Sequence, residues 1–109
     1  MSSINFDEMQ QMQIELQAKY GKVWGQKMEP AFGVRQLLWM IGEASEVGDI
    51  IKKEGEDEIM NNPDTRRHFI EEMTDVMMYF NDLMLCFGIT PEELTEQYRK
   101  KHERNMNRW

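Results

Sequence analysis

The sequence predicts an all-α protein, a helical bundle of about four helices. Apolar residues recur at spacings of three and four, as Met73, Met77 and Phe80 do. No stretch alternates apolar and polar residues as a half-buried strand does, and cap residues separate the periodic segments. With 109 residues, 3 Pro and 7 Gly, the chain is expected to form one domain spanning residues 1–109.

The first two helices are predicted from their ends. Asn5, with Glu8 three residues later, resembles a capping box, and Gly21 is expected to end the first helix. Residues 21–33 contain a proline and three glycines, which predicts a loop. A second helix is expected over residues 34–53, a stretch rich in Leu, Met, Ala and Ile.

The last two helices have clear N-terminal signals. The turn from Asn61 to Asp64 predicts the start of a third helix, which reaches about Cys86 and is closed by Gly88. Thr90 is expected to cap a fourth helix, with a proline at the first helical position and Glu93 at the third. Most of the eleven methionines fall on apolar helical stripes, where they are expected to fill the core.

Composition excludes several classes of protein. The net charge of -7 argues against a nucleic-acid polymer as partner, because phosphate backbones attract clustered Lys and Arg. The single cysteine, Cys86, excludes an intramolecular disulfide and a CxxC zinc site. The N-terminal residues lack the regions of a signal peptide, and the longest apolar runs cover five residues. We therefore expect a cytoplasmic protein without a membrane span.

Two glutamates of the second helix lie off its polar face. At about 100° per residue, the apolar residues share one face: Leu37, Ile41, Ala44, Gly48 and Ile51. The polar face holds Arg35, Ser45, Asp49 and Lys52. Glu43 and Glu46 fall on neither face, but on the side shared with Trp39 and Ile50. A helix with apolar residues on two sides is expected to be sandwiched, so these glutamates point into a packed region.

The third helix repeats this arrangement. Its apolar side carries Phe69, Met73, Val76, Phe80, Leu83 and Met84. Glu72 lies among apolar residues, and Asp75 lies one step further around, whereas Glu71 is on the polar side. Each helix thus presents two acids at spacing i, i+3, which places them on one face. Four carboxylates near apolar surface repel one another, and a hard divalent cation such as Mg²⁺ removes that cost. Pairing with surface Lys or Arg is the alternative.

The two acidic motifs also resemble those of a known family. Gly42-Glu-Ala-Ser-Glu46-Val and Glu71-Glu-Met-Thr-Asp75-Val are similar to the ExxE and ExxD motifs of the MazG-like nucleoside triphosphate pyrophosphohydrolases, over about residues 34–109. The resemblance implies hydrolysis of a nucleoside or deoxynucleoside triphosphate to the monophosphate and pyrophosphate, with Mg²⁺ or Mn²⁺.

Residue roles also follow from the resemblance. It implies that Glu43, Glu46, Glu72 and Asp75 hold the metal, with Glu46 as a candidate catalytic base. Gly42 departs from the family, because many relatives carry a glutamate there.

Substrate contacts are expected at both ends of the chain. Lys101, Asn105 and Arg108 resemble a Lys-xxx-Asn-xx-Arg element of the dUTPase-like branch, which implies contacts with phosphates and sugar. They stand at i, i+4 and i+7, on one face of a continuous helix. A basic helix end that complements the helix dipole is the alternative. Trp24 and Trp39, together with glutamines of the first helix, are candidates for holding a base, and core packing is the alternative.

The sequence leaves two rival functions to compare with this one. A carboxylate-bridged di-iron bundle requires Glu-x-x-His pairs, and neither His68 nor His102 stands three residues after a glutamate. A non-catalytic helical interaction protein that keeps the fold is the second rival. Apolar rows on two sides of the second helix predict a homodimer or homotetramer, since a partner chain would cover them. The sequence does not specify the preferred base or sugar.

Overall fold

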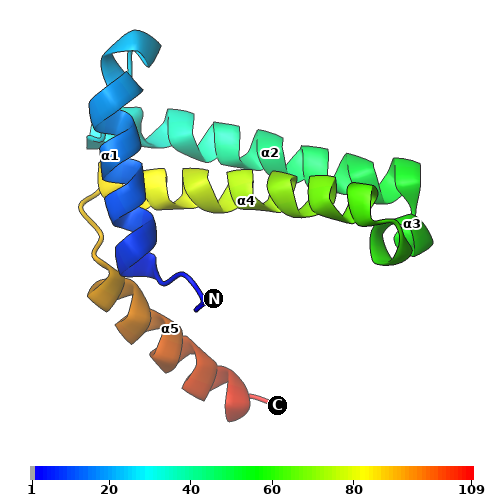
Figure 1. The fold of residues 1–109 in the computed structure, drawn as a ribbon. Coiled ribbons are helices and arrows are strands. Elements are labelled where there is room, and N and C mark those ends of the chain that lie inside the picture. Colours follow the sequence, from blue (N-terminus) through cyan, green and yellow to red (C-terminus); the bar gives the residue numbers. More distant parts are fainter. Residues whose placement is uncertain (1) are drawn as a thin grey trace.

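The computed structural model describes residues 2–109, which form helices joined by short connections (Figure 1). The elements are α1 (Phe6–Trp24), the 3₁₀-helix η1 (Pro30–Phe32), α2 (Gly33–Glu54), α3 (Glu56–Asn61), α4 (Pro63–Cys86) and α5 (Pro91–Met106). No strand occurs among the described residues, so the all-α prediction is confirmed.

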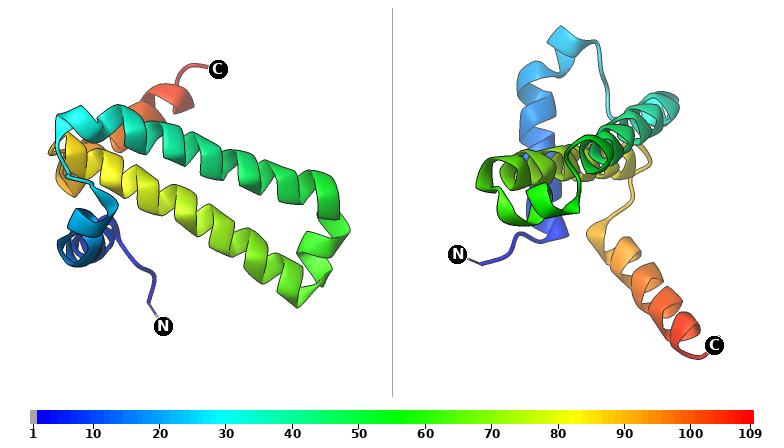
Figure 2. Two further views of the ribbon diagram at one scale, coloured as in Figure 1. Left: turned by 90° about the horizontal axis from the view of Figure 1, so that it is seen from above. Right: turned by 90° about the vertical axis from the view of Figure 1, so that its right-hand side faces the viewer.

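A long helical hairpin is the centre of the fold. Helices α2 and α4 run antiparallel and pack along their lengths, and the short α3 joins them at one end (Figure 1). Helix α1 crosses the other end of the hairpin and packs on α4, whereas α5 leads away from it (Figure 2). Two facing helices can therefore bring side chains together along the hairpin, and α1 can close one end of that seam.

The predicted helix starts agree with the structure. The Asn5 side chain accepts a hydrogen bond from the Glu8 N–H at 2.9 Å, and Asn62 accepts one from the Asp64 N–H at 3.0 Å. Thr90 and Glu93 form a complete capping box, with bonds of 3.1 Å and 3.0 Å. These caps depend on residues within three positions, which explains why the sequence was sufficient.

Two predicted boundaries are wrong. Helix α1 continues through Gly21 to Trp24, because Gly21 is buried beside the backbone oxygen of Gln26 and keeps its helical conformation. The end is Gly25, whose φ of 66° lies in the left-handed region that favours glycine. The loop expected over 21–33 is shorter, and the helix α3 was not predicted.

The interior of the described chain is unusually polar. The buried apolar residues are Ile50, Ile59, Met84 and Cys86. The buried polar residues are Gln10, Gln13, Gln36, Asn81 and Asp82. Several of these polar side chains bond to one another or to neighbouring sulfur and carbonyl groups, as buried polar groups must.

Much of the apolar surface that the sequence assigned to a core is exposed. The α2 residues Leu37, Ile41 and Ile51 are 39%, 51% and 46% exposed. Most of the methionines on the predicted stripe of α4 are also exposed, whereas Met84 is buried. The expectation that these methionines fill the core is therefore wrong for the single chain, because a two-helix hairpin covers only one side of each helix.

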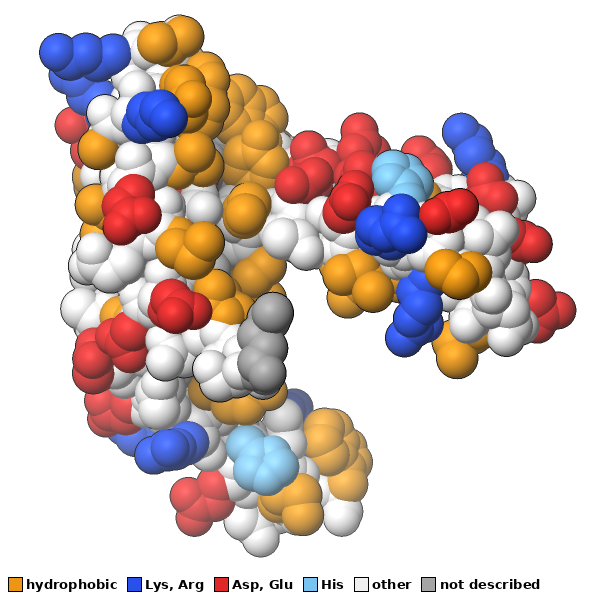
Figure 3. Space-filling model, viewed as in Figure 1, with side chains coloured by type: hydrophobic (Ala, Val, Ile, Leu, Met, Phe, Trp, Pro, Cys, Tyr) orange, Lys and Arg blue, Asp and Glu red, His pale blue; other side chains and the backbone are white. Residues whose placement is uncertain are grey.

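Surface charge is also distributed unevenly. Apolar side chains gather where α1 crosses the hairpin, and acidic side chains lie along the hairpin (Figure 3). None of the described helices combines the length and apolar content that a membrane crossing requires.

Candidate metal centre

Three carboxylates meet on the seam between α2 and α4. Glu43 and Glu46 come from α2 and Glu72 from α4, and each contributes one oxygen to a group in which all three atoms lie within 4.8 Å of one another. We call these residues the carboxylate cluster. The i, i+3 spacing places Glu43 and Glu46 on one face of α2, and the antiparallel packing of α4 places Glu72 opposite them. The predicted convergence of these three residues is thus present in the structure.

Asp75 lies beside the carboxylate cluster rather than within it. Its carboxylate is outside the group of atoms within 4.8 Å, although its charge contributes to raising the pKa of both Glu43 and Glu72. It is half-buried and lines a cleft together with Glu43. The fourth predicted ligand therefore stands at the rim of the site.

The carboxylate cluster has no basic partner. The two ion pairs among the described residues are Arg67–Asp64 and Lys100–Glu96, both elsewhere. One carboxylate oxygen of Glu43 and one of Glu72 are buried without a hydrogen-bond partner. The alternative that these acids pair with surface Lys or Arg is therefore wrong within the described chain.

Crowding changes the acidity of the cluster. Burial, followed by the proximity of Glu46, Asp75 and Glu72, raises the pKa of Glu43 from 4.5 to about 7. The pKa of Glu72 is raised first by a hydrogen bond with Glu46, which forms when one of the two carboxyls is protonated, and then by burial. The protons of such neighbours are shared, so the site titrates as a unit.

These properties fit a hard divalent cation. The group offers oxygen ligands alone, it concentrates negative charge, and it leaves two buried oxygens unpaired. Mg²⁺ and Mn²⁺ prefer such carboxylate ligands, whereas zinc sites use thiolate or imidazole ligands more often. A divalent cation bound by these residues would remove the repulsion that raises their pKa values.

An aromatic cleft of about 350 Å³ opens beside Glu43 and Asp75. Its other lining residues come from α1, α2, α4 and the connection after α1: Gln13, Leu16, Gln17, Trp24, Gln26, Trp39, Met78, Tyr79 and Asp82. The rings of Trp39 and Tyr79 meet edge to face, with centroids 5.8 Å apart. The structure thus brings both predicted tryptophans next to the predicted metal ligands.

A charged hollow of about 350 Å³ lies on the other side of the cluster. It is lined by Glu46, Asp49, Ile50, Lys53, Glu54, His68 and Glu72. Sequence reasoning missed Lys53 and His68 as site residues. The available signal was helical spacing, since Lys53 stands seven residues after Glu46, and His68 stands four before Glu72. The carboxylate cluster therefore separates an aromatic cleft from a hollow that contains basic side chains.

Asp82 forms the polar end of the aromatic cleft, and sequence reasoning missed it too. It is 4% exposed, and its carboxylate accepts hydrogen bonds from the side-chain amides of Gln13 at 2.9 Å and Gln17 at 3.5 Å. Burial raises the pKa of Asp82, and these two hydrogen bonds oppose the rise. The partners come from α1, so no local pattern around Asp82 could have indicated them.

The predicted C-terminal contacts do not reach the cluster within one chain. Lys101 and Asn105 lie on α5, which leads away from the hairpin (Figure 1). Helix α5 ends at Met106, so the prediction of a common helical face is wrong for Arg108, whose guanidinium lies 5.2 Å from the ring centroid of Trp109. Asn105 keeps a buried side-chain oxygen without a partner.

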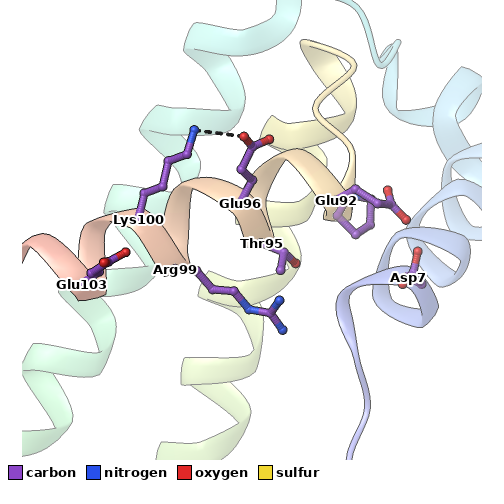
Figure 4. Close-up of a pocket in the computed structure, with 8 residues that line it drawn as sticks. Asp7, Glu92, Thr95, Glu96, Arg99, Lys100 and Glu103 are labelled. Atoms are coloured by element: carbon purple, nitrogen blue, oxygen red, sulfur yellow. Dashed lines mark hydrogen bonds and ion pairs between the residues drawn. The ribbon is translucent and has the colours of Figure 1, made fainter.

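A larger hollow, of about 610 Å³, lies between α5 and the start of α1 (Figure 4). Its lining contains both acids and bases: Asp7, Pro91, Glu92, Thr95, Glu96, Arg99, Lys100 and Glu103. Lys100 pairs with Glu96 at 2.9 Å. This surface contains none of the predicted site residues and no group of converging acids, so size alone does not make it the better candidate.

Comparison with family models, curated proteins and solved structures finds no match to this chain.

Proposed function

We propose that this chain is a Mg²⁺-dependent nucleoside triphosphate pyrophosphohydrolase of the MazG-like type. It would hydrolyse a nucleoside or deoxynucleoside triphosphate to the monophosphate and pyrophosphate. The observation that carries the proposal is the carboxylate cluster, three acids within 4.8 Å that have no basic partner among residues 2–109. The aromatic cleft and the charged hollow on its two sides support a substrate with an aromatic base at one end and phosphates at the other.

Glu43, Glu46 and Glu72 would hold the metal, with Asp75 as a further ligand from the rim. Mg²⁺ would be the resident ion and Mn²⁺ a substitute. When bound, the metal neutralises charge on the phosphates and lowers the pKa of water. Glu46 lines the charged hollow, where it could instead take the proton of the attacking water as general base.

The remaining side chains would bind and orient the substrate. The rings of Trp24 and Trp39 provide surfaces on which a base stacks, since both line the aromatic cleft. Lys53 provides positive charge and His68 an imidazole group in the hollow beyond the acids, where the phosphates would extend. The triphosphate would then extend from the aromatic cleft, past the metal, into the charged hollow.

A second copy of the chain would complete the assembly. Large apolar side chains lie exposed on both helices of the hairpin, among them Ile41 on α2 and Met73 on α4, which supports a homodimer or homotetramer. Lys101, Asn105 and Arg108 would contact phosphates and sugar only if α5 approaches the site of another subunit. The same exposed side chains favour the second candidate, a non-catalytic interaction protein.

A nucleotide panel separates these candidates. Pyrophosphate release from each triphosphate is measured with Mg²⁺ and with EDTA, for the wild type, Glu43→Gln and Asp75→Asn. Metal-dependent release that both variants lose supports the enzyme. The absence of release from every nucleotide, with the protein folded and Mg²⁺ present, would contradict it and favour the interaction protein.

A further inference from the structure

We propose that the polar end of the aromatic cleft selects a base with an exocyclic amino group beside an unprotonated ring nitrogen, as in cytosine and adenine. The groups that would read this edge are Asp82 and Gln26, both held in place by hydrogen bonds from Gln17. The selection rests on the proposed function. The hydrogen bonds that these side chains already make determine which donors and acceptors are left for a ligand.

Most of the amide donors near Asp82 are engaged within the protein. Gln13 donates to Asp82 at 2.9 Å, and Gln17 donates to Gln26 at 3.3 Å and to Asp82 at 3.5 Å. Gln36, which is fully buried, donates to the same Gln26 oxygen at 3.4 Å. These bonds fix the orientation of the Gln13, Gln17 and Gln36 amides, whose nitrogens point toward Asp82 or Gln26.

The acceptors near Asp82 are in excess. The side-chain oxygens of Gln17 and Gln36 are buried without a donor. Asp82 has two oxygens with about four lone pairs, and it receives one short and one long hydrogen bond. An unpaired buried acceptor is costly, so this end of the cleft favours a ligand that donates N–H groups.

Gln26 supplies the complementary donor. Its oxygen accepts from both Gln17 and Gln36, so its amide N–H groups remain for a ligand, and no hydrogen bond of that nitrogen occurs among the described residues. The cleft therefore offers an acceptor at Asp82 and a donor at Gln26, both lining one cavity.

The Watson–Crick edges of the bases differ in how they match this pattern. Cytosine and adenine present an amino donor next to a ring-nitrogen acceptor. Uracil and hypoxanthine present a carbonyl next to a ring N–H, which would place an acceptor against Asp82 and a donor against Gln26. Carboxylates accept from the cytosine amino group in nucleic-acid recognition for the same reason. The aromatic rings of the cleft would stack on any base, so the discrimination falls to the polar end.

The experiment measures base preference without hydrolysis. Calorimetry with Mg²⁺ compares the α,β-methylene analogue of CTP with that of UTP, and the analogue of ATP with that of ITP. The base preference is taken from whichever of these two pairs of analogues binds the protein more tightly. We expect the amino member to bind about tenfold or more tightly, the scale of one good directional hydrogen-bonded contact.

Variants locate the preference. Asp82→Asn keeps an acceptor for Gln13 but adds a donor. The preference for the amino analogue over the oxo analogue should therefore disappear, to a ratio of about one, or reverse. Because Asp82 is buried, Gln17→Met provides a second test at a half-buried position, and it should also reduce the preference. Asp57→Asn, an exposed residue of α3, controls for the loss of one negative charge and should leave the preference unchanged. Circular dichroism confirms that each variant is folded.

The outcomes separate this inference from the proposed function. Equal binding of the amino and oxo members, or a preference that survives in folded Asp82→Asn and Gln17→Met, overturns the inference while pyrophosphate release can persist. Amino-selective binding without hydrolysis of any natural triphosphate overturns the proposed function and supports base selection. Failure of every analogue to bind overturns both.

Discussion

Replacing Glu43 by glutamine should stabilise the metal-free protein. The pKa of Glu43 is raised from 4.5 to about 7, so ionising this carboxyl costs the folded state free energy that the unfolded state does not lose. At about 1.4 kcal/mol per pKa unit, the upper limit is ~3.5 kcal/mol well above pH 7. Glu43 is only half-buried, so solvent screening and proton sharing reduce the expected gain to about 1–2 kcal/mol.

The sign of the pH dependence follows from the same shift. Because the folded-state pKa is the higher one, the contribution to stability is complete below about pH 4.5 and is lost as pH rises toward about 7. Wild-type protein in EDTA should therefore be more stable at pH 5 than at pH 8. Glu43→Gln should lack most of this difference, and its advantage should appear only at the higher pH.

Urea unfolding followed by circular dichroism measures the effect at fixed protein concentration. For a chain of this size, 1–2 kcal/mol moves the midpoint by about 1 M. Glu71→Gln is the matched control, because Glu71 is exposed next to Glu72 and outside the cluster, and it should leave the midpoint nearly unchanged. Adding Mg²⁺ should stabilise the wild type more than Glu43→Gln. A variant less stable than the wild type in EDTA at pH 8 would refute the reasoning.

Three further predictions concern the interior, the charged hollow and the exposed faces. Gln13→Ala should lower the free energy of unfolding by about 3 kcal/mol, because it leaves the carboxylate of Asp82 buried with a single long hydrogen bond, and thermal unfolding measures the loss. Lys53→Met should raise KM for the triphosphate more than it changes kcat, whereas Lys52→Met, on the exposed polar face, should change neither. Sedimentation equilibrium should show a dimer or larger species for the wild type. Ile41→Glu places a charge on the exposed apolar face and should give a smaller species. A monomeric wild type would count against the assembly.

Local features of the fold were predictable from the sequence. The caps at Asn62 and Thr90 use neighbours within three residues, and the helical period of α2 and α4 is continuous. Features that depend on contacts between distant parts of the chain were not predictable from the sequence. Gly21 stays helical because the chain folds back to place Gln26 beside it. Met73 and Met77 of α4 are exposed because α1 covers only one end of the hairpin.

Some residues of the candidate site were likewise predictable from the sequence, and others were not. Glu43, Glu46 and Glu72 were predictable because two i, i+3 pairs on facing helices must converge if the helices pack. Asp82 was not predictable, because its surroundings are supplied by α1 residues about 65 to 70 positions earlier. The position of α5 likewise depends on contacts that the sequence of a single helix does not encode.

The most direct test of the account is ³¹P nuclear magnetic resonance of a nucleoside triphosphate incubated with the protein and Mg²⁺. The triphosphate is the one that the nucleotide panel shows to be cleaved fastest. We expect the resonances of the monophosphate and pyrophosphate to appear together with the wild type and with Glu71→Gln, and to be lost with Glu72→Gln. Release of inorganic phosphate and a diphosphate, or turnover by folded Glu72→Gln at the wild-type rate, would contradict the claim that the carboxylate cluster performs pyrophosphohydrolysis.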